Sequence, residues 1–525
     1  MSATTYTVHT DVLFDPMQKK FLNNISVTVD RVSGLITKVY ERKEPLDQVN
    51  SPDIDLRGKV VLPGLVDAHT HIFLHSYDEA SSTVQKRDES FVERIIRAVN
   101  HCKIGLMAGY TTYRDLGSES MQEADCNVRD AINRGLMVGP RLFVATRIIA
   151  STSAYEVRTE NALGGTCCGA GADTADGVDE VRKCVRRRLG AGADIIKFYA
   201  DYRRRIMRFP PKQQHPYVSS VQFPPEKPNP DSILFTQDEM NAIVEEAEMG
   251  DCPVAAHCGS KEAVKAAAKA GALTIEHAYW ADEETLQVMK DKGCIFVPTL
   301  AVCERFHGAR MADILHNTKR AWEMGIKLAC GGDTGTYPHG ENARELELML
   351  DAGVPLEEVL HAATVGGWES CGGDRCGRKF GWFAEGVAAD MISLDADPRD
   401  PGVKDALRKV NFVMKDGKVW KQGGSDPDGD PLRTLEMDAW AWTFQDCESI
   451  NESERMDDLL DFLHVFCMPW IWKELSDDTP FDLGLHTVYG NLVKNAKRNG
   501  AIVDAADVGH LLPAIPFTMS PVRAF

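Results

Sequence analysis

The residues best suited to chemistry begin with His69 and His71, in the segment VDAHTH. Their i, i+2 spacing places both imidazoles on one face of a strand, and the apolar run VVLPGLV that leads into them is typical of a strand. Two imidazoles from one strand can share a divalent metal ion. An isolated His-x-His pair could equally be structural, so a metal site requires further ligands elsewhere in the chain.

Lys197 is the next candidate, and it lies within the apolar segment ADIIKFYA. A lysine on an apolar strand is costly to bury unless it is paired or chemically altered. Carboxylation would turn its amine into an anionic carbamate, whose two oxygens could bridge two metal ions. A salt bridge to a buried carboxylate is the simpler alternative, and the sequence leaves both open.

Three more candidates follow apolar runs later in the chain. His257 ends VAAH, His277 ends TIEH, and Asp333 comes directly after LACGG. One histidine at a strand end is more often structural than ligating, but two on consecutive strands after a buried lysine favour a metal site. An aspartate at a neighbouring strand end could bind metal and also accept a proton from water.

These residues converge only if their strands lie side by side. From Val60 onward, apolar runs alternate with amphipathic segments, as in parallel βαβ units. Helices are expected at Lys261–Lys269, after Ser260 as N-cap, and at Asp282–Lys292, which is acidic at its start and basic at its end. Eight strands are predicted within residues 59–385, the number that a TIM-type (β/α)8 barrel requires: Val60–Ala68, Thr111–Asp115, Arg141–Thr146, Asp194–Tyr199, Pro253–His257, Leu273–His277, Cys294–Thr299 and Leu328–Gly331.

The two flanks of the barrel, residues 1–58 and 386–422, are predicted to form one small β-sandwich domain. An Asp-Gly turn at Asp416–Gly417 suggests a hairpin near the second flank's end. Five β-rich segments support this domain: Thr5–Val8, Ile25–Val29, Ile36–Tyr40, Asp390–Asp395 and Asn411–Lys415.

Two segments depart from the barrel pattern. The insertion 200–235 begins with a basic stretch and could form a lid over the barrel mouth or be a tolerated surface insertion. Residues 423–525 begin with the acidic linker GGSDPDGDP. Apolar residues at helical spacing then predict a C-terminal helical extension of unknown role, with a poorly ordered extension as the alternative: Leu459, Leu460, Leu463 and Phe466.

Composition bounds the class of protein. The chain has 525 residues, of which 43% are hydrophobic and 26% charged, an ordinary globular balance that suits a barrel with an accessory domain. Its formal net charge of -19 disfavours binding to nucleic acid or anionic membranes. We see no secretory signal, no membrane span and no zinc-ribbon CxxC pair among the 14 cysteines, so we expect a cytoplasmic protein with reduced thiols.

Several of these segments, taken in order, resemble the metal-dependent amidohydrolase superfamily from about Tyr6 to Gln422. They are VVLPGLVDAHTH, GADIIKFYAD, PVAAHC, TIEHA, GGDTGTYPHG and ADMISLDADP…VNFVMKDGKVWK. The lysine-bearing fourth strand is most similar to the imidazolonepropionase-related branch, which includes Xaa-Pro dipeptidases and ochratoxinase-like amidases. The long insertion before His257 and the tail after Pro431 depart from the family pattern.

The resemblance implies a metal-dependent hydrolase that cleaves a carbon–nitrogen bond, amide or peptide-like, with a metal-bridged hydroxide. Dipeptides and N-acyl amino acids would be typical small-molecule substrates, and barrels of this kind often form homo-oligomers. The resemblance also implies two zinc ions held by six residues: His69, His71 and Asp333 at the first ion, His257 and His277 at the second, and an N6-carboxylated Lys197 that bridges both.

Three residues would act in catalysis on this expectation. Asp333 would carry a proton from water to the leaving nitrogen. Tyr199, two residues past Lys197, could donate to the oxyanion, and His339 could bind a substrate carboxylate or carbonyl. A packing role for the tyrosine and a solvated loop position for this histidine are the alternatives.

Two other functions compete with the binuclear hydrolase. A mononuclear-metal deaminase on the same barrel would use a glutamate near the fifth or sixth strand, and Glu276 is the candidate, although strand alternation should turn it away from His277. A catalytically silent scaffold is the second alternative, but such proteins commonly lose metal ligands, and all six candidate positions are present here.

Overall fold

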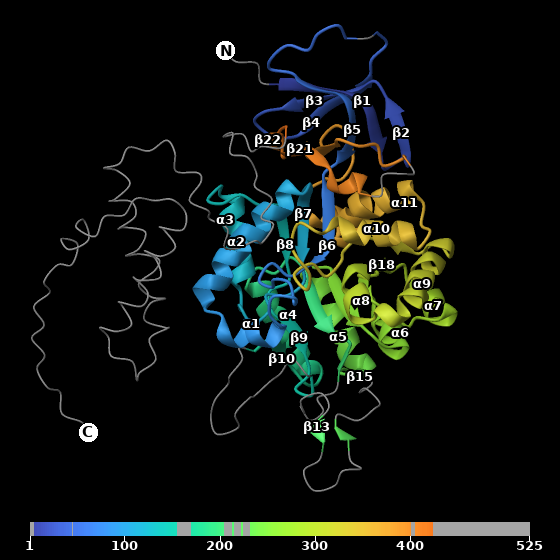
Figure 1. The fold of residues 1–525 in the computed structure, drawn as a ribbon. Helices are drawn as coiled ribbons and strands as arrows, with labels where there is room; N and C mark the ends of the chain where they lie inside the picture. The colour runs from blue at the N-terminus through green and yellow to red at the C-terminus, as the bar shows by residue number, and fades with distance from the viewer. Residues whose placement is uncertain are drawn as a thin grey trace, which may run out of the picture. The chain divides into compact units, whose positions relative to one another are not determined.

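The computed structural model of the chain describes residues 5–44, 46–154, 170–203, 213–214, 222–223, 231–400 and 405–423 (Figure 1). Strands alternate with helices from β6 (Leu65–Thr70) to α11 (Leu356–His361), which confirms the predicted α/β class. The predicted C-terminal helical extension lies outside the described residues.

Eight parallel strands follow one another in the predicted order. Two hydrogen bonds join their two sheets: Asp194 N donates to Val144 O and Ala68 N donates to Cys330 O, both at 2.8 Å. These bonds place β8 beside β11 and the end of the last strand beside β6, so the strands complete a ring. The first sheet contains β6, β7 (Tyr110–Asp115) and β8 (Arg141–Val144), and the second contains β11 (Ile196–Tyr199), β16 (Val254–Cys258), β17 (Thr274–His277), β18 (Ile295–Val297) and β19 (Lys327–Leu328). Two short strands beyond the predicted eight, β9 (Ile148–Ala150) and β10 (Ala172–Thr174), extend the second sheet beside β11.

Helices lie outside these strands and cover them (Figure 1). The two predicted helices, one from the Ser260 cap and one from the charge distribution of Asp282–Lys292, are present as α6 (Lys261–Ala270) and α7 (Glu283–Asp291). The hydroxyl of Ser260 accepts from Ala263 N, and the carboxylate of Asp282 accepts from Thr285 N, so each cap satisfies a free amide of the first turn. The other α-helices are α1 (Ser82–Asp88), α2 (Phe91–Met107), α3 (Ala124–Asn133), α4 (Val178–Gly190), α5 (Gln237–Met249), α8 (Leu300–Phe306), α9 (Met311–Glu323), α10 (Ala343–Asp351), α11 and α12 (Gly367–Ser370).

The predicted first barrel strand, Val60–Ala68, is two strands. Its first part belongs to β5 (Ile54–Pro63), which pairs with β20 (Met391–Leu394) outside the barrel. Only β6 belongs to the barrel. The break falls at Pro63 and Gly64, where proline lacks an amide donor and a Cβ on the glycine would meet Thr111 Oγ1 at 2.2 Å.

Strands from both flanks of the barrel join in one sheet. Its order is β22-β21-β20-β5-β1-β3-β4, with β2 paired to β1, so the strands before the barrel and those after it form two blocks that meet where β5 pairs with β20. A bridge between Leu35 and Ala388 brings the β4 end of this sheet back toward β20, and the enclosed apolar side chains form one core cluster. The remaining strands are β1 (Thr5–Asp15), β2 (Lys20–Asn23), β3 (Ile25–Asp30), β4 (Ile36–Glu41), β21 (Val410–Lys415) and β22 (Lys418–Lys421).

Part of the insertion predicted at 200–235 is described. β12 (Asp201–Arg203) pairs antiparallel with β15 (Asp231–Ile233), so the insertion leaves the barrel and returns to it through one ribbon. A second pair, β13 (Gln213–Gln214) with β14 (Gln222–Phe223), lies farther along it. The lid function proposed for this segment stays a prediction, because most of its residues are outside the described part.

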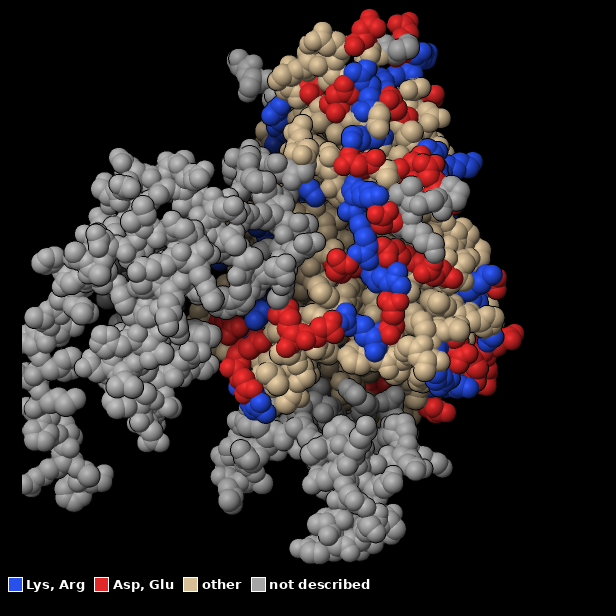
Figure 2. Space-filling model, viewed as in Figure 1, with Lys and Arg blue, Asp and Glu red and all other residues tan. Residues whose placement is uncertain are grey.

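The visible surface carries both signs of charge. Acidic and basic side chains are interspersed over the face seen in Figure 2. Across the described ranges, no helix combines the length and the apolar character needed to cross a bilayer. The expected lack of nucleic-acid binding stays a prediction.

A buried ion cluster joins the barrel to the sheet formed by strands from both flanks, which we call the composite sheet. Arg141 of β8 donates to Asp390 Oδ2 at 2.8 Å, to Asp416 Oδ1 at 2.7 Å and to Thr112 Oγ1 at 2.9 Å. The side chain of Asp390 is only 1% exposed, so its charge depends on this arginine for solvation.

We expect Arg141→Met to lower the free energy of unfolding by about 3–5 kcal/mol, because it leaves Asp390 as an unpaired buried charge. Urea unfolding followed by circular dichroism measures this. Lys409→Met, which removes an exposed ion pair with Asp405, should cost less than about 1 kcal/mol. Equal effects of the two substitutions would show that the buried cluster does not join the two parts.

Candidate metal centre

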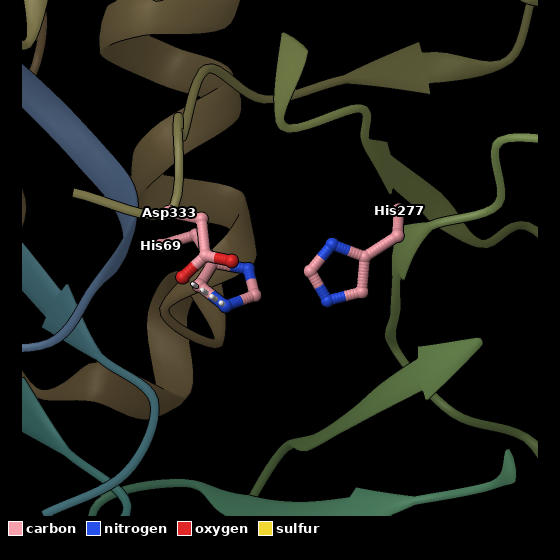
Figure 3. A group of neighbouring side chains, drawn as sticks. All are labelled: His69, His277 and Asp333. Atoms are coloured by element: carbon pink, nitrogen blue, oxygen red, sulfur yellow. Dashed lines mark ion pairs between the residues drawn. The ribbon is translucent and has the colours of Figure 1, made fainter. Parts of the chain in front are cut away.

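Three side chains from distant parts of the chain offer ligand atoms to one point. One ligand atom each from His69, His277 and Asp333 lies within 4.8 Å of the others. Figure 3 shows the three side chains turned toward one another from β6, β17 and the loop after β19. Two imidazoles and a carboxylate are ligands that zinc accepts.

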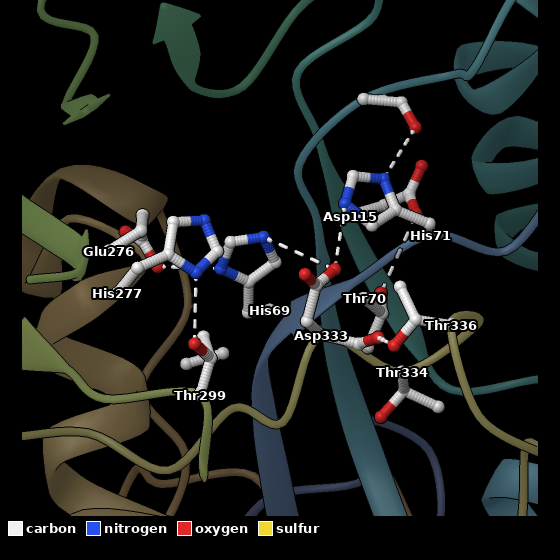
Figure 4. Close-up of polar contacts among 12 residues, drawn as sticks. His69, Thr70, His71, Asp115, Glu276, His277, Thr299, Asp333, Thr334 and Thr336 are labelled. Carbon is white, nitrogen blue, oxygen red and sulfur yellow. Dashed lines mark hydrogen bonds and ion pairs between the residues drawn. The ribbon is translucent and has the colours of Figure 1, made fainter. Parts of the chain in front are cut away.

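Asp333 lies between the two histidines of the HTH segment. Its Oδ1 is 3.2 Å from His71 Nε2 and 3.7 Å from His69 Nε2 (Figure 4). Burial raises the pKa of Asp333, but His69 and His71 outweigh this effect and lower it to about 2. Burial likewise lowers the pKa of His71, while its bond to Asp333 and the charge of Glu119 raise it to about 9. The aspartate is therefore an anion at neutral pH.

The other two histidines lie together across the centre. The rings of His257 and His277 are 4.3 Å apart between centroids, and the ring of His277 is 5.1 Å from that of His69. His277 Nδ1 lies 2.9 Å from Thr299 Oγ1 and 3.0 Å from the Tyr279 hydroxyl. Burial and the neighbouring His257 hold the pKa of His277 well below its ordinary value, so the ring is neutral and its lone pair is available.

Lys197 lies on β11 beside the strand of His257. The residue is 2% exposed, and its Nζ has no hydrogen-bond partner among the described residues. Burial and the nearby Arg114 lower its pKa to about 8, although Glu276 opposes the shift. The charge of Lys197 also contributes to lowering the pKa values of His69, His277 and Asp333.

The backbone is strained where two of these ligand candidates stand. His277 has a φ of 72° and Asp333 a φ of 65°, the left-handed region that non-glycine residues rarely adopt. Such conformations persist where the surroundings enforce them, and they cluster at functional sites. The segment before Asp333 also lies very close to β6, because a Cβ on Gly331 would meet His69 N at 2.5 Å. The glycine lets the segment before Asp333 lie directly against β6.

The six predicted ligands are thus brought together at one end of the barrel strands, and their roles as ligands stay predictions. Two further residues adjoin them: Arg114, which the sequence analysis did not single out, and Glu276, which it considered only for the deaminase alternative. Glu276 Oε2 lies 2.8 Å from His69 Nδ1 (Figure 4). Arg114 donates to Glu276 Oε1 at 2.8 Å. Burial alone would raise the pKa of Glu276, but Arg114 and His69 hold it well below its ordinary value. A charged residue within the strand TTYRD was the available signal for Arg114, the same signal that marked Lys197.

The contacts of Glu276 bear on the deaminase alternative. Both carboxylate oxygens are engaged by His69, Arg114 and Thr274, and the residue is 0% exposed. A proton-transfer glutamate must reach the substrate. The Glu276 carboxylate is instead held by its three buried partners. This arrangement disfavours the mononuclear deaminase.

Tyr199 and His339, the two remaining catalytic candidates, lie in different surroundings. Tyr199 is opposite His257 in the strand register, and their rings are 5.0 Å apart, so the tyrosine borders the centre. His339 is 8% exposed, stacks on His101 at 4.1 Å and lies 3.1 Å from Leu74 O through Nε2. It is therefore not the solvated loop histidine of the alternative interpretation, and contact with substrate stays a prediction.

Comparison with known proteins agrees with this geometry. Residues 60–421 match the model of the amidohydrolase family. Ochratoxinase from Aspergillus niger is 30% identical over 427 residues, which cover 74% of this chain and 81% of that protein.

Solved structures are also similar. The crystal structure of A. niger ochratoxinase matches with a TM-score of 0.67 and 27% identity, covering 83% of this chain and all of the other. A Xaa-Pro dipeptidase with methionine bound in its active site matches with a TM-score of 0.63 and 27% identity, over 79% of this chain and all of the other. The chain therefore belongs to the amidohydrolase family, and it is a hydrolase that acts on carbon–nitrogen bonds of the amide or peptide kind.

Proposed function

We propose that this hydrolase works with two divalent metal ions, zinc by the chemistry of the donors, and that an N6-carboxylated Lys197 bridges them. His69, His71 and Asp333 would hold one ion, and His257 and His277 the other. The observation that carries the proposal is the buried Lys197 amine, which lacks a hydrogen-bond partner among the described residues. A buried amine without a partner is costly, and carboxylation would give this position an anionic group suited to metal.

The donor set supports zinc. Imidazole nitrogens and carboxylate oxygens are ordinary zinc ligands, whereas calcium and magnesium prefer oxygen donors alone. Four imidazoles with one aspartate and one carbamate would give each ion several protein ligands and leave room for water, as hydrolytic sites require. Divalent ions at this centre would lower the pKa of water to near neutrality and polarise the scissile carbonyl.

The chain's own residues would move the proton. The Asp333 carboxylate is anionic at neutral pH and lies at the centre of the cluster, so it can accept a proton from water and deliver it to the leaving nitrogen. Tyr199, at the border of the centre beside His257, is placed to donate a hydrogen bond to the oxyanion that forms as the carbonyl is attacked.

The substrate we propose is a dipeptide or an N-acyl amino acid. The chain resembles an ochratoxinase, a Xaa-Pro dipeptidase and a prolidase whose structure was solved with N-methylphosphonate-L-proline, the last at 26% identity with a TM-score of 0.66. A catalytically silent barrel would be free to lose its metal ligands, whereas all six candidate residues are present in this chain.

Metal removal tests the function directly. We expect the purified chain to hydrolyse members of a panel of dipeptides and N-acyl amino acids, to lose this activity on dialysis against a chelator, and to regain it with Zn²⁺. Release of free amino acid measures turnover. Activity that survives complete metal removal, as checked by elemental analysis, would contradict the proposal.

Lys197→Ala tests the bridge. We expect about two metal ions per chain in the parent protein and a clear loss in the variant, because the carbamate would be a ligand of both ions. Elemental analysis measures the content. Lys415→Ala is the matched control, since Lys415 is also a buried lysine with a pKa lowered to about 8, but it lies on β21 of the composite sheet and donates to Gly139 O. Parent-like metal content in both variants would rule out a bridging lysine.

Asp333→Asn tests the proton transfer. We expect kcat to fall roughly 100- to 10,000-fold, the usual contribution of a general acid–base residue. Steady-state kinetics beside metal analysis separates lost chemistry from lost metal. The surface change Asp291→Asn should leave kcat unaltered. Near-parent turnover of the Asp333 variant with its metal retained would remove this residue from the mechanism.

A further inference from the structure

We propose that Glu276 and Arg114 form a positioning pair that fixes His69 as an Nε2 metal ligand. Neither residue would touch metal or substrate, and both would act through the His69 ring. This inference rests on the proposed function, since it assumes that an ion binds beside His69.

The hydrogen bond between Glu276 and His69 selects the tautomer of the histidine. Glu276 Oε2 lies 2.8 Å from His69 Nδ1, and both side chains are almost completely buried. A carboxylate accepts but does not donate, so the ring nitrogen that faces it carries the hydrogen. The lone pair of the neutral ring is then on Nε2, the nitrogen that faces Asp333 at 3.7 Å.

Arg114 holds the carboxylate in place. Its guanidinium donates to Glu276 Oε1 at 2.8 Å and to Thr274 Oγ1 at 2.9 Å, both on β17. Its Nε donates to Ala68 O at 2.5 Å, on the residue directly before His69. The arginine therefore ties the carboxylate on β17 to the backbone of β6 from a side chain that is 1% exposed. Neither the acid nor the imidazole is free to rotate.

Two of the other histidines have neutral hydrogen-bond acceptors behind them. His71 Nδ1 faces the backbone carbonyl of Gly117 at 3.1 Å, with the Glu119 carboxylate farther away at 3.6 Å, and His277 Nδ1 faces the hydroxyl of Thr299 at 2.9 Å. A carboxylate partner increases the basicity of a ligating imidazole more than a neutral acceptor does, and loss of such a partner typically weakens metal binding 10- to 100-fold. The loss should therefore concentrate on the ion that His69 holds.

Zinc competition against a chromogenic chelator, on the metal-depleted full-length chain, tests the pair. We expect Glu276→Gln to weaken binding of one ion about 10- to 100-fold. The visible absorption bands of Co²⁺ bound in place of zinc should also change, because they report the ligand field at the ion. Glu276→Gln combined with Arg114→Met should give the same loss while leaving no buried charge unpaired, so it replaces the single variant if that one fails to fold.

Glu345→Gln is the matched control. Glu345 is also a buried glutamate, at 1% exposure, but it accepts from Ala301 N at the start of α8. We expect it to bind zinc and Co²⁺ as the parent does. Parent-like affinity and Co²⁺ bands in the Glu276 variants would overturn the positioning pair alone. A parent chain that binds no metal would overturn the proposed function instead.

Discussion

Burial of many ionisable groups at one end of the barrel is the constraint on which the rest of this structure depends. Charges removed from water must find partners in the interior, or the fold is destabilised. Asp333 lies against His71, and Glu276 lies against Arg114. Where the barrel meets the composite sheet, Asp390 lies against Arg141. Lys197 stands apart from this pattern, because its amine has no such partner among the described residues. The lack of a partner for this buried amine within the described ranges points to a functional role for Lys197.

The sequence predicts most of the fold because its signals are local. Each barrel strand is an apolar run between amphipathic segments, and the caps of α6 and α7 can be read from single residues. The boundary between β5 and β6 is not predicted, because no charged residue interrupts Val60–Val66 and only the pairing with β20 shows that the first half of this run lies outside the barrel. Pairing over such distances has no local signature.

The residues of the metal centre could also be predicted where their signals are local, and not where they depend on contacts between distant parts of the chain. Its six predicted ligands are charged or imidazole residues within apolar runs or at their ends, which is a local pattern. The contact between Glu276 and His69 could not be read in this way, since it joins residues 207 apart in the chain. Strand alternation predicts that Glu276 turns away from His277, yet both side chains lie near His69: Glu276 Oε2 is 2.8 Å from His69 Nδ1, and the rings of His277 and His69 are 5.1 Å apart. The left-handed φ of 72° at His277, which no residue pattern announces, still brings that ring to the same centre.

The composite sheet has a consequence for how the chain is made. Leu62 pairs with Ile392, more than 300 residues later, and the barrel lies between them in the sequence. During synthesis, β1 to β5 leave the ribosome long before their partners β20 to β22 exist. Until then β5 presents an open edge, which favours pairing with other chains. The sheet can therefore be completed only after the barrel has been synthesised. Chains truncated before β20 keep the exposed edge of β5 and should aggregate.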